Sequence, residues 1–209
     1  PEKEPFLYNR MIQPLVPYAI RGVIWYQGEA NVGDDMIYHE KMKALIAGWR
    51  HVWKQDKPFP FYFVQLAPYS SYPRDALPKI WEAQTATLAV PNTGMTVTTD
   101  ITGNMGDIHP KNKQDVGRRL ALWALARTYQ RKNLVYSGPL YESMRIEGDK
   151  IRLAFAHTGS GLKSRDGKPL TQFSIAGKTG PYVQATAVIE GRTVVVHSPR
   201  IAAPARVSF

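Results

Sequence analysis

The sequence predicts an α/β fold, in which a parallel sheet is flanked by helices, followed by a smaller antiparallel β domain. In residues 1–133, apolar runs of strand length alternate with segments of helical periodicity, as in βαβ units. In residues 134–209, short apolar runs are separated by turns that contain glycine, which is typical of β-hairpins. The hydrophobic share of 44% and the charged share of 21% are those of an ordinary globular protein. We therefore expect two domains, with the boundary after residue 133.

The α/β region opens with a helix, a strand and a second helix. Leu7–Ala19 predicts a short helix that Pro14 and Pro17 interrupt. The apolar run Gly22–Tyr26 predicts a buried strand. From Met36 to Trp53 apolar residues recur at helical spacing with charges between them, which predicts an amphipathic helix that covers the sheet.

Two further strand and helix pairs follow. Phe61–Leu66 is rich in aromatic and β-branched residues and predicts a strand, and Ile80–Val90 predicts the next helix. Met95–Thr99 predicts a third strand, and the segment from Asn112 to Gln130 predicts the last helix. Because each helix returns the chain to the start of a parallel strand, we expect the three loops that follow the strands to share one sheet edge.

Residues 134–209 predict strands joined by tight turns. The expected strands are Ser143–Glu147, Lys150–Ala156, Gln172–Ala176, Val183–Ile189 and Thr193–His197. The chain ends on the apolar run Ala205–Phe209, so we expect this β domain to be incomplete, sandwich-like and to have one unpaired edge. We also expect both ends of the chain to lie inside a longer protein.

Composition excludes several classes of function. The net charge of +10 is spread evenly, with 17 basic and 12 acidic residues in residues 1–133 and 10 and 5 in residues 134–209. Without a basic cluster, this favours a solvated surface over a nucleic-acid interface. The chain has no cysteine and no apolar run of the roughly 20 residues that a membrane-spanning helix needs. We expect neither a nucleic-acid partner nor a membrane span.

Polar residues follow the first and third predicted strands. Gln27 and Glu29 flank Gly28, which permits a tight turn, while Asp107 and His109 lie just before the last helix. A carboxylate two residues before a histidine can orient the ring and favour its protonated form, as a general base for an alcohol requires. Taken alone, such a pair is more often a helix cap or a structural contact than a catalytic dyad.

Metal and nucleotide sites find no support. His39, Glu40, Asp107 and His109 are ligand types, but their spacing matches no paired zinc motif. The chain also lacks a glycine-rich phosphate loop. We expect no metal and no organic cofactor.

Several blocks together resemble one family. Five segments resemble, in order and in approximate spacing, the sialate O-acetylesterase family of SGNH-type hydrolases. They are Pro5–Pro17, Trp25–Asn31, Phe63–Pro68, Glu82–Gln84 and Asp107–Ala121. The resemblance implies that residues 1–133 form the C-terminal part of an SGNH-like esterase domain whose first strands are missing. Residues 134–209 are similar to the family's C-terminal β domain.

The resemblance also implies roles. His109 would be the general base, Asp107 would hold and polarise it, and Gln27 beside Gly28 would donate to the oxyanion. Glu29 has three possible roles: a bond within the loop, a partner for His109 in place of Asp107, or a structural turn carboxylate. The wider pattern places the acid three residues before the histidine rather than two, so Asp100 is the reserve acid.

The serine nucleophile is absent from the expected context. The family carries it in a Gly-Gln-Ser-Asn block near the first strand, and no serine here has that setting. The resemblance thus implies that an upstream segment or a companion chain supplies the serine.

The leading hypothesis is a carbohydrate O-acetylesterase that removes acetyl groups from sugar hydroxyls through a serine acyl-enzyme. The alternatives are an acetylxylan or other polysaccharide deacetylase of the same fold and a non-catalytic carbohydrate-binding relative. Because O-acetylated glycans are mostly extracellular, we expect a periplasmic or extracellular location. The sequence leaves open the glycan, the acetyl position and the oligomeric state.

Overall fold

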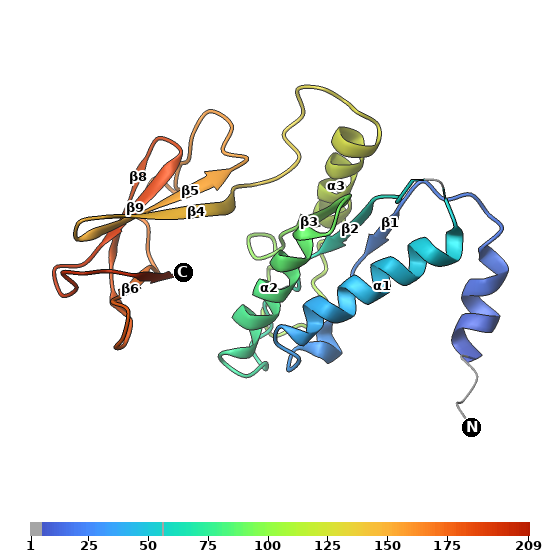
Figure 1. The fold of residues 1–209 in the computed structure, drawn as a ribbon, viewed down its shortest axis with the longest axis horizontal. Helices are drawn as coiled ribbons and strands as arrows, with labels where there is room; N and C mark the ends of the chain where they lie inside the picture. The colour runs from blue at the N-terminus through green and yellow to red at the C-terminus, as the bar shows by residue number, and fades with distance from the viewer. Residues whose placement is uncertain (1–5, 56) are drawn as a thin grey trace. The chain divides into compact units, whose positions relative to one another are not determined.

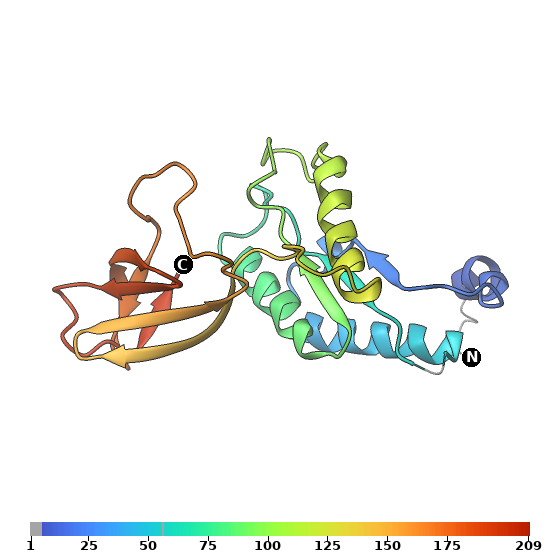
Figure 2. The ribbon, with the colours of Figure 1, turned by 90° about the horizontal axis from the view of Figure 1, so that it is seen from above.

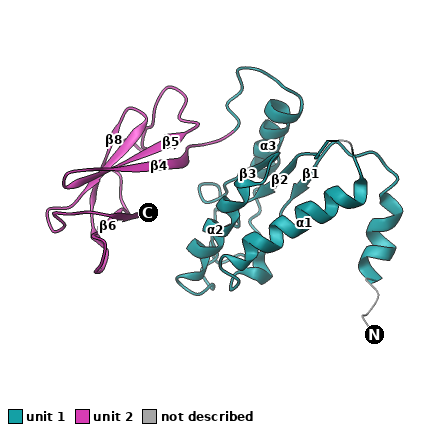
Figure 3. Cartoon of the chain, viewed as in Figure 1, with its two compact units in different colours: residues 1–136 teal, residues 137–209 magenta. Residues whose placement is uncertain are grey.

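The computed structural model describes residues 6–55 and 57–209. The chain divides into two compact units, Pro1–Tyr136 and Ser137–Phe209 (Figure 3). The sequence places this boundary slightly earlier, after residue 133. No helix among the described residues is long and apolar enough to cross a membrane.

Unit 1 begins with two short helical turns instead of the single helix expected over Leu7–Ala19. A π-helical turn, η1, spans Tyr8–Ile12, and a 3₁₀ turn, η2, spans Gln13–Leu15. Pro14 lies at the start of η2, where its ring and its missing N–H prevent a regular α-helix from continuing. Turns and bends then connect η2 to the sheet.

The sheet of unit 1 has three parallel strands in the order β1-β2-β3 (Figure 1). Their bounds are Val23–Trp25 for β1, Phe61–Val64 for β2 and Thr93–Thr96 for β3. In the register, Phe61 of β2 lies opposite Val23 of β1 on one side and Thr93 of β3 on the other. This arrangement confirms the parallel sheet that the alternating pattern predicts.

Helices cover both faces of the sheet, and as a result all four side chains of β2 are buried. On one face, α1 (Ile37–Trp53) and α2 (Ala76–Ala86) pack against Phe61 and Phe63. On the other face, α3 (Lys113–Trp123) packs against Tyr62 and Val64. Figure 2 shows α3 on the opposite side of the strands from α1 and α2.

Two helices differ in detail from the pattern in the sequence. α2 begins at Ala76 rather than at Ile80, because Pro78 lies in the first turn, where a helix tolerates proline. It continues into a 3₁₀ turn, η4, over Thr87–Ala89, and α3 continues into a π-helical turn, η5, over Ala124–Thr128.

Unit 2 consists of two antiparallel sheets with a shared apolar core. One sheet has the order β4-β5-β9-β8 and the other the order β10-β6-β7. Their bounds are Leu140–Glu147 (β4), Lys150–Ala156 (β5), Ser174–Ala176 (β6), Val183–Gln184 (β7), Thr186–Glu190 (β8), Thr193–His197 (β9) and Arg206–Ser208 (β10). Buried residues of both sheets, among them Ile151, Ile175 and Val196, form one core. This arrangement confirms the antiparallel β domain.

The run Val183–Ile189 is not a single strand. It divides into β7 and β8, which belong to different sheets, and Ala185 between them is buried in the core. The apolar pattern continues without a break because both strands contribute inward side chains to the same core. The apolar segment near residue 209 contains β10, which pairs with β6.

Gly94 of β3 provides a test of the packing between the sheet and α3. A Cβ atom at this position would lie 2.5–2.9 Å from three ring atoms of Trp123, whose indole N–H donates to the Met95 carbonyl at 3.0 Å. We expect Gly94→Ala to lower the free energy of unfolding by about 1–3 kcal/mol, because overpacking must displace the indole.

The control is Gly117→Ala on α3, where an added Cβ has no neighbour within 4 Å. That change should stabilise the helix by up to about 1 kcal/mol. Chemical denaturation followed by circular dichroism measures both effects, and equal stability of the Gly94 variant and the wild type would contradict the proposed packing.

Candidate active site

Three loops meet where the parallel strands end. The loop after β2 is bonded to β3, since the Gln65 N–H donates to the Thr96 carbonyl at 2.8 Å and the Thr98 hydroxyl donates to the Gln65 carbonyl at 3.2 Å. Further along, the Ser70 N–H donates to the Met105 carbonyl at 2.8 Å. The carboxyl edge of the sheet therefore holds the loop that precedes His109.

The loop after β1 is a tight turn built around Gly28. Gly28 has a φ of +148°, which L side chains rarely adopt, and a Cβ there would lie 2.7 Å from the Tyr38 hydroxyl. The same hydroxyl donates to the Gln27 carbonyl at 2.9 Å, while the Gly28 N–H donates to the Glu29 carboxylate at 2.9 Å. The backbone of Gln27 is thereby fixed by a buried side chain of α1, while the Gln27 side chain is exposed.

Glu29 lies among three tyrosines. Burial, together with the negative charge of Glu29, raises the pKa of Tyr38 and of Tyr72 to about 12. Burial and the same charge also raise the pKa of Tyr26. The contact with the Gly28 N–H is the first of the three roles that the sequence leaves open for Glu29.

The loop before α3 places Asp107 and His109 next to each other through the backbone. The His109 N–H donates to Asp107 Oδ1 at 2.8 Å, which is an Asx-type turn. The His109 imidazole is exposed and forms no hydrogen bond within residues 6–55 and 57–209. Asp107 thus orders the backbone that carries the histidine, while the ring itself is accessible.

Asp100, the reserve acid, is engaged by α3. Both of its carboxylate oxygens accept from Arg119, at 2.7 and 2.6 Å, and the same guanidinium donates to the Val97 carbonyl at 2.6 Å. A bidentate pair of this kind holds both groups in a defined geometry. The structure brings Asp100 to Arg119, and the pair ties the loop after β3 to α3.

Three supporting residues were not singled out as candidates from the sequence: Tyr38, Gln84 and Arg119. Gln84 is 1% exposed, accepts from the Leu66 N–H at 3.0 Å and donates to the Val64 carbonyl at 3.3 Å. An amide on the apolar face of α2 is a signal that could have identified it, because buried polar groups need partners. Tyr38 is less conspicuous, since it continues the apolar face of α1.

Lys113 adds a positive charge beside the first loop. Its Nζ lies 4.7 Å from the ring centroid of Tyr26, the residue before Gln27. Lys113 is the first residue of α3, where the helix dipole disfavours a cation, and it has no ion pair within the described part of the chain. The Tyr26 ring therefore holds a cation that has no direct ion pair close to Gln27.

The free edge of β1 is apolar. Among the described residues, β1 pairs with β2 only, and Ile24 on β1 is 68% exposed. A cavity of about 430 Å³ lies beside this edge, lined by residues that include Tyr18, Trp49 and Trp53. In the described residues no group of three or more His, Asp or Glu side chains is placed to hold a metal ion.

Comparisons with known proteins agree with one another. Residues 2–126 match the family model described as carbohydrate esterase, sialic acid-specific acetylesterase. The chain is 37% identical over 168 residues to the human sialate O-acetylesterase, covering 72% of this chain and 32% of that protein. It is 38% identical over 167 residues to the enzyme of Rattus norvegicus, covering 70% and 30%.

A solved structure is also similar. The crystal structure of a carbohydrate acetylesterase from Xanthomonas citri matches with a TM-score of 0.88 and 41% sequence identity, over 96% of this chain and 47% of that chain. The chain thus spans about a third of the length of the curated relatives and just under half of the solved chain.

The raised pKa of Tyr38 predicts a loss of stability at alkaline pH. Burial raises this pKa from 10.0 to about 12, so between these values the unfolded chain releases the proton while the folded protein keeps it. Stability from this group is fully present below pH 10 and is lost as the pH rises toward 12. Tyr38→Phe removes the effect, so between these pH values the wild type should lose about 2 kcal/mol more unfolding free energy than the variant. Denaturant titrations below pH 10 and near pH 12 test this, and parallel pH profiles would refute it.

Proposed function

Because the chain belongs to the family of carbohydrate esterases described as sialic acid-specific acetylesterases, we propose that it supplies the general base and an oxyanion donor of a carbohydrate O-acetylesterase. The observation that carries this proposal is the convergence of the Gln27 and His109 loops at the carboxyl edge of one parallel sheet. Both side chains are exposed there, and the backbone of each is held by a hydrogen bond.

The chemistry follows from these two groups. His109 takes the proton of a serine hydroxyl as the serine oxygen attacks the acetyl carbonyl carbon, and the Gln27 amide donates to the carbonyl oxygen as it becomes negative. The protonated histidine then gives the proton to the departing sugar oxygen, which leaves an acetyl-serine. Water, deprotonated by His109, then attacks the acetyl carbon. The bond to the serine oxygen breaks, His109 returns the proton to that oxygen, and acetate leaves.

The acidic residues divide into three tasks in this proposal. Asp107 is the partner of His109, since it already bonds to that residue's backbone. Asp100 holds the loop to Arg119, and Glu29 holds the turn at Gly28. This assignment keeps a carboxylate adjacent to the base and uses the other two to order the loops.

The nucleophilic serine comes from a segment outside these 209 residues. Two observations support this. The relatives are two to three times longer than the chain. The free edge of β1 exposes an apolar residue, which is typical of a strand that pairs with a further strand. Ser70 is joined to the loop before His109 by a backbone hydrogen bond. It lies in a loop of Tyr, Pro and Ser residues and lacks the family's serine block, so it serves as a control.

The substrate is an O-acetylated sugar that carries a negative charge. Lys113 supports this choice, because it has no ion pair among the described residues and its charge lies on the ring of Tyr26, next to Gln27. A neutral acetylated polysaccharide such as acetylxylan is the second candidate, since the acetyl chemistry itself requires no charge. Such glycans are mostly extracellular, so a periplasmic or extracellular location is part of the proposal.

The base and the oxyanion donor can be tested in the full-length protein. His109→Ala should abolish labelling by a fluorophosphonate and lower kcat for acetyl-ester hydrolysis roughly 1,000-fold or more. Gln27→Ala should lower kcat by about 100- to 1,000-fold. His51→Ala, at an exposed position on α1, is the matched control, and Ser70→Ala should keep both labelling and activity.

The outcomes separate the alternatives. Peptide mapping should place the label on a serine outside residues 1–209. A label on Ser70 would overturn the assignment of the nucleophile, and a full-length protein that binds acetylated sugars without labelling or hydrolysis would favour the non-catalytic relative.

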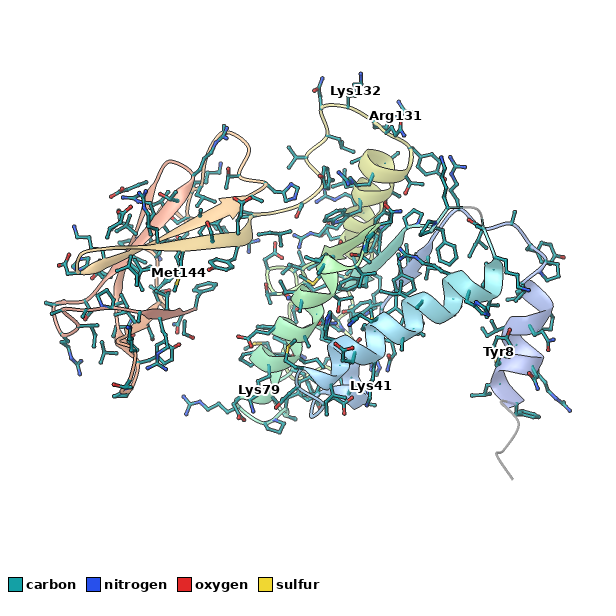
Figure 4. The ribbon with its side chains drawn as sticks, in the orientation of Figure 1. Tyr8, Lys41, Lys79, Arg131, Lys132 and Met144 are labelled. Carbon is teal, nitrogen blue, oxygen red and sulfur yellow. The ribbon has the colours of Figure 1, made fainter. Side chains whose placement is uncertain are left out.

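The charge of Lys113 predicts substrate preference. Lys113→Gln should raise KM about five-fold for an acetylated sugar with a carboxylate, because a partly exposed charge pair contributes up to about 1 kcal/mol. KM for acetylated xylo-oligosaccharides should not change. The control is Lys132→Gln, which lies beyond the far end of α3 (Figure 4). Equal KM values for charged and neutral substrates in the wild type would favour the acetylxylan alternative.

A further inference from the structure

Tyr38 links the Gln27 turn to the core of unit 1 through a hydrogen bond. It lies in the first turn of α1, is 3% exposed and packs in the same core as Met42 and Ile46. Its hydroxyl donates to the Gln27 carbonyl at 2.9 Å. A helix anchored in the core therefore holds the backbone of a residue whose side chain is exposed.

The fit between Tyr38 and the turn is close. A Cβ on Gly28 would lie 2.7 Å from the Tyr38 hydroxyl and 3.1 Å from the adjacent ring carbon, so the hydroxyl occupies the space that any other residue at position 28 would need. The turn cannot move toward α1 without a clash, and it cannot move away without breaking the bond to the Gln27 carbonyl. Both directions of displacement are opposed.

The hydroxyl also has the right chemical form. A carbonyl only accepts hydrogen bonds, so Tyr38 must remain protonated to donate. Burial raises the pKa of Tyr38 to about 12, which keeps the proton in place throughout the physiological range.

Tyr38 further connects two loops of the site. The Gln84 side chain is near enough to the Tyr38 hydroxyl to lower its pKa, in opposition to burial. The same amide bonds the backbone of Val64 and Leu66, at the end of β2. The ends of β1 and β2 are thus held by adjacent buried groups from α1 and α2.

We propose that Tyr38 is a positioning residue, which aims the Gln27 amide at the oxyanion by fixing the Gln27 carbonyl and the turn at Gly28. The inference rests on the proposed esterase function. An oxyanion donor contributes only when it is already in place as the charge develops, and a displacement of about 1 Å can cost about 100-fold in rate. Loss of the phenol hydroxyl leaves the Gln27 carbonyl without its buried donor and frees the turn.

The test is Tyr38→Phe in the full-length protein. The ring and its packing remain, so kcat for an acetyl ester should fall about 10- to 100-fold while KM changes less than two-fold. The matched control is Tyr62→Phe, which removes another buried tyrosine hydroxyl, bonded to Thr128 at 2.8 Å in the core on the other face of the sheet. This control should lower the melting temperature and leave kcat unchanged.

A double-mutant cycle distinguishes the two proposals. If Tyr38 acts through Gln27, Tyr38→Phe should have less than a two-fold effect on kcat in a Gln27→Ala background. A Gln27→Ala variant with wild-type kcat would refute the proposed function itself. A large kcat loss in Gln27→Ala, with wild-type kcat in Tyr38→Phe, would refute the positioning role alone, as would an equal kcat loss in Tyr62→Phe.

Rescue gives a second readout if the phenylalanine variant folds poorly. Replacing Tyr38 with 4-aminophenylalanine keeps an N–H donor at the same place, so kcat should return to within about ten-fold of the wild type. A folded protein with this residue and with the kcat of Gln27→Ala would overturn the proposal.

Discussion

The central strand β2 is buried on both faces, and the rest of unit 1 depends on that arrangement. Phe61 and Phe63 point to α1 and α2, while Tyr62 and Val64 point to α3. Helices cover the apolar side chains on each face, and a parallel neighbour on each side of β2 completes the backbone hydrogen bonds. Once the three strands are parallel, the loops that follow them have to emerge at the same edge. The site is a consequence of how the core is covered.

That core also controls the site at short range. The turn at Gly28 is held by Tyr38, the exit of β2 by Gln84 and the loop after β3 by Arg119. Each of these side chains belongs to a different helix. Each bonds to the segment between its own helix and the strand before it. Exposed groups such as Gln27 and His109 therefore rest on backbone that the buried layer restrains. Rigid support of this kind is what an oxyanion donor and a general base require, because neither can reorganise during the reaction without losing rate.

Charge is arranged around the same edge in a consistent way. Glu29 and Asp100 are both occupied in loop contacts, Asp107 bonds to the backbone of His109, and Lys113 lies on Tyr26 without a carboxylate partner in the described residues. The acidic groups thus order the loops through hydrogen bonds, and Lys113 places a cation without an ion pair near Gln27. In the proposed function, this cation is the feature that favours an anionic sugar. The exposed apolar residue on β1 supports the proposal that a serine-bearing segment joins the sheet on that side.

The sequence by itself determined the order of the elements, the parallel sheet, the antiparallel β domain and the two loops that carry Gln27 and His109. These features depend on hydrophobic periodicity and on turn residues, and both can be recognised from residues that are close together in the sequence. The start of α2 and the division of Val183–Ile189 were not predictable from the apolar pattern, because a tolerated proline and a change of sheet leave that pattern intact. Only the tertiary structure decided that Asp100 pairs with Arg119, that Asp107 bonds to the His109 backbone and that Tyr38 lies under Gly28. The first and last of these contacts join different structural elements, so the packed core selects them. The second is a local Asx-type turn, and Asp107 forms it because the tertiary structure gives this loop the conformation that the turn needs.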